Sequence, residues 1–113
     1  MTIWSPRSTR KTHITYNKIF MGLVHFHQKR NEKAEILLKE ALNHSKEIAC
    51  HIMTIFSHLG MAFVNNERNC KDEAIYHLEA GIKVAQNHDI YYFMYMNKED
   101  ILKAGQLCIE YKL

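Results

Sequence analysis

The sequence predicts an all-α fold in which helical hairpins stack side by side. The chain of 113 residues contains one proline and four glycines, so it is poor in residues that break helices. Its apolar residues recur at helical spacing over most of its length. A pattern of small and large residues also occurs twice, 38 positions apart at its glycine (22 to 60) and 40 apart at its alanine (34 to 74). The first copy consists of Gly22, His25, Ala34, Leu38 and Ala41, and the second of Gly60, Phe63, Ala74, Leu78 and Gly81.

The chain begins with a polar and basic segment, residues 1–12, which we expect to form a flexible arm. Pro6 supports this expectation because it disfavours the helical conformation at Ser5. Trp4 is the exception, since a large aromatic side chain in an arm often docks on another surface. The helical domain is then expected to span residues 13–113.

Within this domain, apolar spacing predicts helices over residues 13–28, 31–46, 47–65, 70–86 and 89–110. Asn31 is a suitable N-cap for the second helix. Polar residues at 28–31 and 65–69 predict turns. The apolar residues 90–96 alone would also suit a strand. We assign them to a helix because an apolar stripe continues from them to Leu107.

Composition excludes several classes of protein. Hydrophobic residues make up 47% of the chain, which argues against disorder of the whole chain. The formal charge of +3 is lower than a dedicated nucleic-acid-binding protein requires. Cys50, Cys70 and Cys108 form no disulfide framework, and the N-terminus lacks a secretory signal. We therefore expect a cytoplasmic protein without a membrane segment.

No motif in the sequence indicates catalysis or metal binding. A nucleophilic cysteine would need a neighbouring base, and the phosphate-binding and zinc-binding motifs are absent. His25 and His27 point to different sides of a helix. His51 and His58 share a face but are separated by two turns, about 10 Å. We therefore expect a protein that is not an enzyme and has no cofactor and no metal.

The two copies of the pattern resemble tetratricopeptide repeats, a family of helix pairs with small residues at fixed positions. Residues 15–48 match that motif without a gap, although His25 occupies a position where an aromatic residue is usual. Residues 53–88 match with about two extra residues in the turn. Gly81 replaces the last alanine of the motif. The closing proline is missing from both copies, where Ser45 and Ala85 stand instead.

The repeats are longer than the family's standard unit. In this respect they resemble the peptide-sensing domains of Gram-positive quorum regulators of the Rap, Rgg and PlcR type. The segments 40–45 and 78–85 add to this second resemblance. It implies a sensor for peptide pheromones that lacks the output domain such regulators carry.

The resemblance to tetratricopeptide repeats implies a concave groove lined by the first helix of each pair. By position, the groove residues are Tyr16, Ile19, Leu23, Phe26, His27, Thr54, Ser57, Met61, Val64, Asn65 and Asn97. Asn65 or Asn97 would hydrogen-bond the backbone of an extended apolar peptide. The alternatives are that the asparagines serve helix ends or turns, and that Tyr16, Phe26 and Met61 belong to the core. A clamp for peptide carboxylates is excluded because the lysine and asparagine it needs are absent.

Two further sets of residues have structural roles in this prediction. The small residues at the helix crossings are Gly22, Ala34, Ala41, Gly60, Ala74 and Gly81, where larger side chains would force the helices apart. In each pair the glycine of the first helix should meet the alanine of the second. Large side chains fill positions 91–96 without interruption, and on a helix some of them must face solvent. We expect Tyr91, Tyr92, Phe93 and Tyr95 to form a partner surface, with a homodimer preferred.

Together these features predict a protein- or peptide-binding scaffold. The alternative is a structural subunit of a larger complex that docks through the fifth helix and has no peptide ligand. Binding of nucleic acid through Arg7, Arg10 and Lys11 is disfavoured, since a small basic cluster is usually a solvated arm.

Overall fold

The computed structural model describes residues 6–88 and 98–112, and in these ranges the fold is all-α without a strand. The helices are α1 (Pro6–His27), α2 (Asn31–Glu47), α3 (His51–Glu67), α4 (Lys71–Asn87) and α5 (Lys98–Glu110). The expectations for Trp4, Tyr91, Tyr92, Phe93, Tyr95 and Asn97 lie outside the described residues. None of the described helices is long and apolar enough to cross a membrane.

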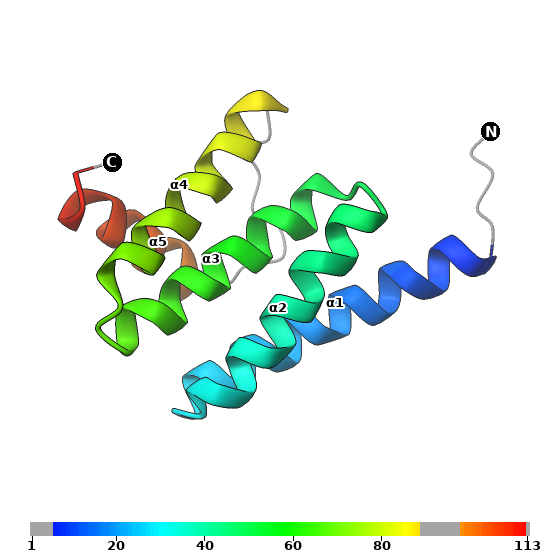
Figure 1. The fold of residues 1–113 in the computed structure, drawn as a ribbon, viewed down its shortest axis with the longest axis horizontal. Helices are drawn as coiled ribbons and strands as arrows, with labels where there is room; N and C mark the ends of the chain where they lie inside the picture. The colour runs from blue at the N-terminus through cyan, green and yellow to red at the C-terminus, as the bar shows by residue number, and fades with distance from the viewer. Residues whose placement is uncertain (1–5, 89–97, 113) are drawn as a thin grey trace.

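The first four helices form two antiparallel hairpins, α1–α2 and α3–α4, that stack through contacts of α3 with α2 and α1 (Figure 1). This arrangement agrees with the predicted stack of helical hairpins. The molecule is elongated, with extents of 44 × 30 × 23 Å. Helix α3 occupies the middle of the stack, and every residue from Met53 to Asn65 is buried.

Helix α1 begins earlier than expected. Residues 6–12, which we assigned to a flexible arm, form its first turns. The reason lies in Pro6, which stands at the first helical position. A proline is favoured there because its missing N–H has no helical partner and its φ angle already suits a helix.

The turns that end α1, α2 and α3 share one conformation. Lys29, Ala49 and Asn69 each adopt a positive φ, between 53° and 65°. The amide of the next residue bonds to the carbonyl five positions earlier, as in Cys50 N–H to Ser45 O at 2.9 Å. This is the Schellman arrangement that ends many helices. It recurs every 20 residues, so α3 begins at His51 and not at residue 47 as expected.

Leu38 of α2 sits between the two glycines of the repeated pattern. A Cβ atom added to Gly22 or to Gly60 would lie 2.8 Å from the Leu38 side chain. The Gly22 position is also 3.5 Å from the Ala34 carbonyl oxygen, at the α1–α2 crossing that we expected. For Gly60, however, the nearest atoms belong to Leu38 and not to the expected Ala74. Gly60 therefore makes room at the junction between the hairpins.

The remaining small residues of the pattern are buried. Ala34, Ala41 and Ala74 have no exposed surface. A Cβ atom added to Gly81 of α4 would meet the Cβ atom of His58 at 3.3 Å, so Gly81 allows α4 to approach α3 closely.

Candidate binding surface

The predicted groove residues fall into two groups. On α1, Ile19 and Phe26 are buried, Tyr16 and Leu23 are half-buried, and His27 is exposed. On α3, all of the expected residues are buried: Thr54, Ser57, Met61, Val64 and Asn65. An open hollow along α3 is therefore not what the structure shows.

The polar groove residues of α3 are bonded within the protein. The Ser57 hydroxyl donates to the Met53 carbonyl oxygen at 2.8 Å, and the Thr54 hydroxyl lies 2.9 Å from that of Ser45. The Asn65 amide donates to the Met61 carbonyl oxygen at 2.8 Å. Asn65 thus stabilises the end of its own helix, which was the alternative to a peptide contact.

Part of the surface formed by α1 and α3 holds α5. The ammonium group of Lys103 lies 4.5 Å from the ring centroid of Phe26 on α1 and 5.8 Å from that of Phe63 on α3. The Tyr111 hydroxyl donates to Asn66 Oδ1 at 2.6 Å. We call Phe26, Phe63 and Asn66 the α5 seat.

Two buried aromatic rings form the base of the α5 seat. The ring centroids of Phe26 and Phe63 are 5.8 Å apart, with the ring planes tilted by 33°. Because the face of an aromatic ring is electron-rich, the pair attracts the cation of Lys103. Leu107 of α5 is buried in the same core cluster as both rings. The seat and the core beside it therefore accept the cation of Lys103, the aliphatic side chain of Leu107 and the hydroxyl of Tyr111.

Most of this seat was not predicted from the sequence. The predicted groove contains Phe26 but not Phe63, Asn66, Lys103 or Tyr111. A signal was available, because residues 103, 107 and 111 are spaced by four and share one face of a helix. Their contact with Phe26 and Asn66 depends on tertiary packing and has no local signature.

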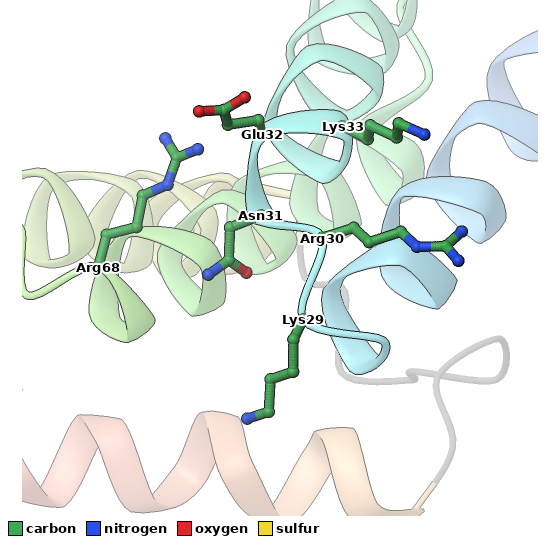
Figure 2. Close-up of a pocket in the computed structure, with 6 residues that line it drawn as sticks. All are labelled: Lys29, Arg30, Asn31, Glu32, Lys33 and Arg68. Carbon is green, nitrogen blue, oxygen red and sulfur yellow. The ribbon is translucent and has the colours of Figure 1, made fainter.

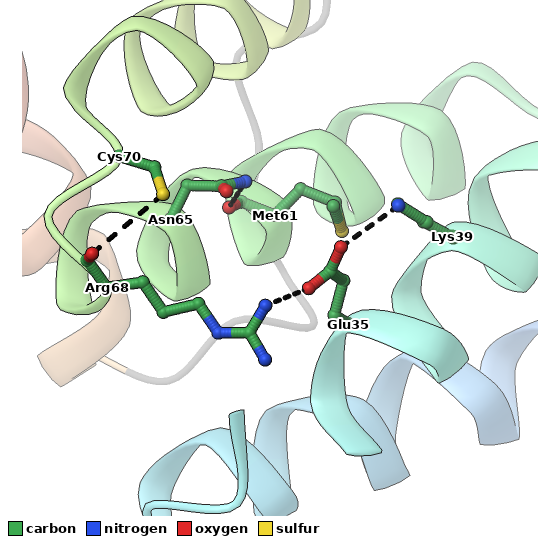
Figure 3. A network of polar contacts seen from close by, with 6 residues as sticks. All are labelled: Glu35, Lys39, Met61, Asn65, Arg68 and Cys70. Atoms are coloured by element: carbon green, nitrogen blue, oxygen red, sulfur yellow. Dashed lines mark hydrogen bonds and ion pairs between the residues drawn. The ribbon is translucent and has the colours of Figure 1, made fainter. Parts of the chain in front are cut away.

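Ion pairs surround the end of α3 beside the seat. Figure 3 shows the Glu35 carboxylate of α2 between Lys39 and Arg68. The hydrogen bond from Lys39 holds the pKa of Glu35 below its usual range, burial opposes this effect, and Arg68 adds to it. Lys29 pairs with Glu67 at 2.7 Å and lowers the pKa of that carboxyl group. These pairs connect the α1–α2 hairpin to α3.

A polar depression of about 540 Å³ lies at the α1–α2 turn, as Figure 2 shows. Its lining residues are Lys29, Arg30, Asn31, Glu32, Lys33 and Arg68. Lys29 and Arg68 are already paired with glutamates, and the lining also contains the acidic side chain of Glu32. The depression therefore carries little uncompensated charge to hold an anionic ligand.

Two histidines meet in the interface between α3 and α4. The Nδ1 atoms of His58 and His77 are 3.0 Å apart, so one ring must donate an N–H to the other. Burial lowers the pKa of His58 to about 4 and also lowers that of His77. Both rings are therefore neutral at pH 7. Among the residues that the structure describes, no three His, Cys, Asp or Glu side chains gather as metal ligands would.

The outer face of α1 is unusually apolar for an exposed surface. Its large apolar residues and their exposed fractions are Ile14 42%, Phe20 47%, Met21 52% and Val24 51%. Because the opposite side of α1 is packed in the core, this helix is apolar on two faces.

No protein-family model, curated protein or solved structure matches the chain. The similarity to tetratricopeptide repeats and to quorum regulators thus stays a prediction from the residues quoted above.

Proposed function

We propose that the chain is a non-enzymatic scaffold that binds another polypeptide at the α5 seat. One observation carries this proposal: the seat already holds a helix of the chain through side-chain contacts with Lys103, Leu107 and Tyr111. A surface that accommodates one helix offers the apolar contacts and the hydrogen-bonding group that a second polypeptide needs.

Two depressions in the described part of the chain do not have the lining of a small-molecule site. One is lined by the charged residues described above, and a second by Asn69, Cys70, Lys71, Asp72 and Glu73. Small-molecule sites are mostly apolar clefts with a few polar groups, and neither depression has that character.

The test is capture of binding partners with a photo-crosslinking amino acid in place of Leu23, which is half-buried on α1 beside Phe26. A matched control carries it in place of Asn43, which is exposed on α2. We expect a polypeptide product, identified by mass spectrometry, at position 23 only. Equal products at both positions, or none, would contradict binding on this side of the molecule.

The narrower proposal from the family resemblance is a sensor for peptide pheromones. It predicts that pools of apolar heptapeptides bind the full chain and bind less well to Asn66→Ala, which loses the amide of the seat. Binding by both proteins with equal affinity would place the peptide elsewhere.

A second candidate function is that of a structural subunit within a larger complex or a homodimer. The exposed apolar face of α1 favours it, because such a face is usually covered in an assembly. Light scattering on the pure protein gives its oligomeric state, and purification from cells gives the size of its partners. A dimer or a large partner would favour this candidate over a peptide receptor. A clean monomer without a large partner would contradict it.

A further inference from the structure

Helix α5 is held by one face only. Leu107 is 4% exposed, whereas Leu102 and Ile109 on other faces of the helix are 64% and 81% exposed. Gly105 has no heavy atom near the position of a Cβ atom, so it makes no close contact that only glycine would allow. A helix of 13 residues has little stability in water by itself. The order of α5 therefore depends on its contacts with the seat.

Three of the residues that make these contacts form a simple pattern. Lys103 and Leu107 are four positions apart on one side of α5, and Tyr111 stands four positions further on, in the turn directly after α5. Each meets a different feature of the seat: the two phenyl rings, the apolar core, and the oxygen of Asn66. This pattern defines the chemistry of any helix that the seat will accept.

We propose that the seat recognises an amphipathic helix of another protein that carries a cationic, an aliphatic and a tyrosine side chain at positions i, i+4 and i+8, and that α5 competes with it. The inference rests on the proposed function, since it specifies the partner of the same surface. The competition follows from covalent connection. A segment tethered through a short linker acts at an effective concentration of roughly millimolar, so a partner must displace it.

The experiment uses a labelled synthetic peptide with the sequence of residues 98–112 as the probe, under reducing conditions. Its affinity is measured by fluorescence anisotropy for the full-length protein and for Leu107→Asp, which removes the aliphatic contact of the tethered α5. Ile109→Asp is the matched control, because it places the same charge on the exposed side of α5. A peptide that itself carries Leu107→Asp is the negative control for the probe.

We expect the probe to bind Leu107→Asp at least about tenfold more tightly than the wild type or Ile109→Asp. The altered probe should bind none of them. A double variant, Lys103→Ala with Tyr111→Phe, keeps Leu107 and should give a smaller gain. It provides the same test if Leu107→Asp fails to fold, which circular dichroism would reveal.

Equal affinity of the probe for all proteins, or no binding to any, overturns the inference. So does a wild-type dimer that dissociates in Leu107→Asp, because a second copy's α5 would then fill the seat. Crosslinking from position 23 judges the proposed function separately, since it detects a polypeptide of any sequence on this side of the molecule.

Discussion

Gly60, like Gly22, stands where the packing leaves no room for a side chain. Its added Cβ atom would lie 2.8 Å from Leu38 Cδ2 and 3.0 Å from Cδ1. Leu38 cannot turn away, because it is fully buried and Gly22 confines it on its other side. We expect Gly60→Ala to lower the free energy of unfolding by about 1–3 kcal/mol through overpacking. Urea denaturation measures this free energy. A smaller loss in a Leu38→Ala background would show that the clash is with Leu38. An unchanged midpoint would contradict the close packing of Gly60 against Leu38.

Gly105 is the opposite case among the glycines. No heavy atom lies within 4 Å of its Cβ position, and the residue is exposed inside α5. Gly105→Ala should therefore raise helix stability by about 1 kcal/mol, because alanine restricts the unfolded chain and costs no contact. The increase should appear in the local exchange of α5 amides. A loss of protection there would mean that position 105 is covered.

The buried pair His58 and His77 makes stability depend on pH. Their pKa values lie below 6.5 in the folded protein, so the unfolded chain binds more protons as the pH falls. The stabilisation is complete above pH 6.5 and is lost as the pH falls through the folded value of about 4. The first proton can bind Nε2 of the donor ring, where it does not break the hydrogen bond between the two Nδ1 atoms. The second proton must bind Nδ1 of the acceptor ring, and two N–H groups then face each other. The neighbouring charges are mixed: Glu73 and Glu35 raise the pKa of His77, while Lys39 and Lys46 lower it.

We expect a loss on the order of 2 kcal/mol in the free energy of unfolding between pH 6.5 and pH 4. Urea titrations at half-unit pH steps measure it. The variant His58→Leu/His77→Leu fills a similar volume without a titratable group and should lose most of the slope above pH 4.5. A slope that persists in this variant would assign the effect to other groups.

At the scale of elements, the turn that ends α1, α2 and α3 is not occupied by the residues that would make it most stable. Ala49 holds φ at 53°, a left-handed conformation that its Cβ atom disfavours. Ala49→Gly should therefore stabilise the protein by about 0.5–1 kcal/mol. Asn69→Gly at the equivalent turn should gain less, because asparagine tolerates this conformation. Thermal melts of both variants give the comparison. A larger gain at position 69 would show that the turn geometry does not decide the outcome.

Local signals in the sequence account for much of the fold but not for all of its boundaries. Apolar periodicity was enough to predict α2 and α4 nearly to their ends. It could not locate the turn after α2, because neither glycine, asparagine nor proline stands at residues 48–50. The start of α1 was wrong because Pro6 was interpreted through its effect on Ser5 and not as a first helical residue.

At the scale of the molecule, the packing of α3 determines where a binding surface can lie. Because α3 contacts α1, α2 and α4, its successive buried residues leave no free side for a continuous groove. From positions in the family motif, the sequence predicted which residues of α3 would line a groove. It did not predict that α5 would lie against the ends of α1 and α3, since contacts between distant segments follow from packing and not from periodicity. The candidate surfaces are therefore the α5 seat and the exposed apolar face of α1.

This arrangement predicts a gradient of local stability. Amides of α3 should exchange with deuterium only through global unfolding, because all of their neighbours must separate first. Amides of α5 should exchange through a smaller opening that breaks only the contacts between α5 and the rest of the protein, including those of Ala104 and Cys108 with the core. Leu107→Asp should accelerate exchange in α5 and leave α3 as the most protected helix. Native-state hydrogen exchange with mass spectrometry measures the rates for α3 and α5 separately. Simultaneous acceleration in α3 and α5 would show that α5 belongs to the same cooperative unit and cannot leave its seat while the hairpins stay folded.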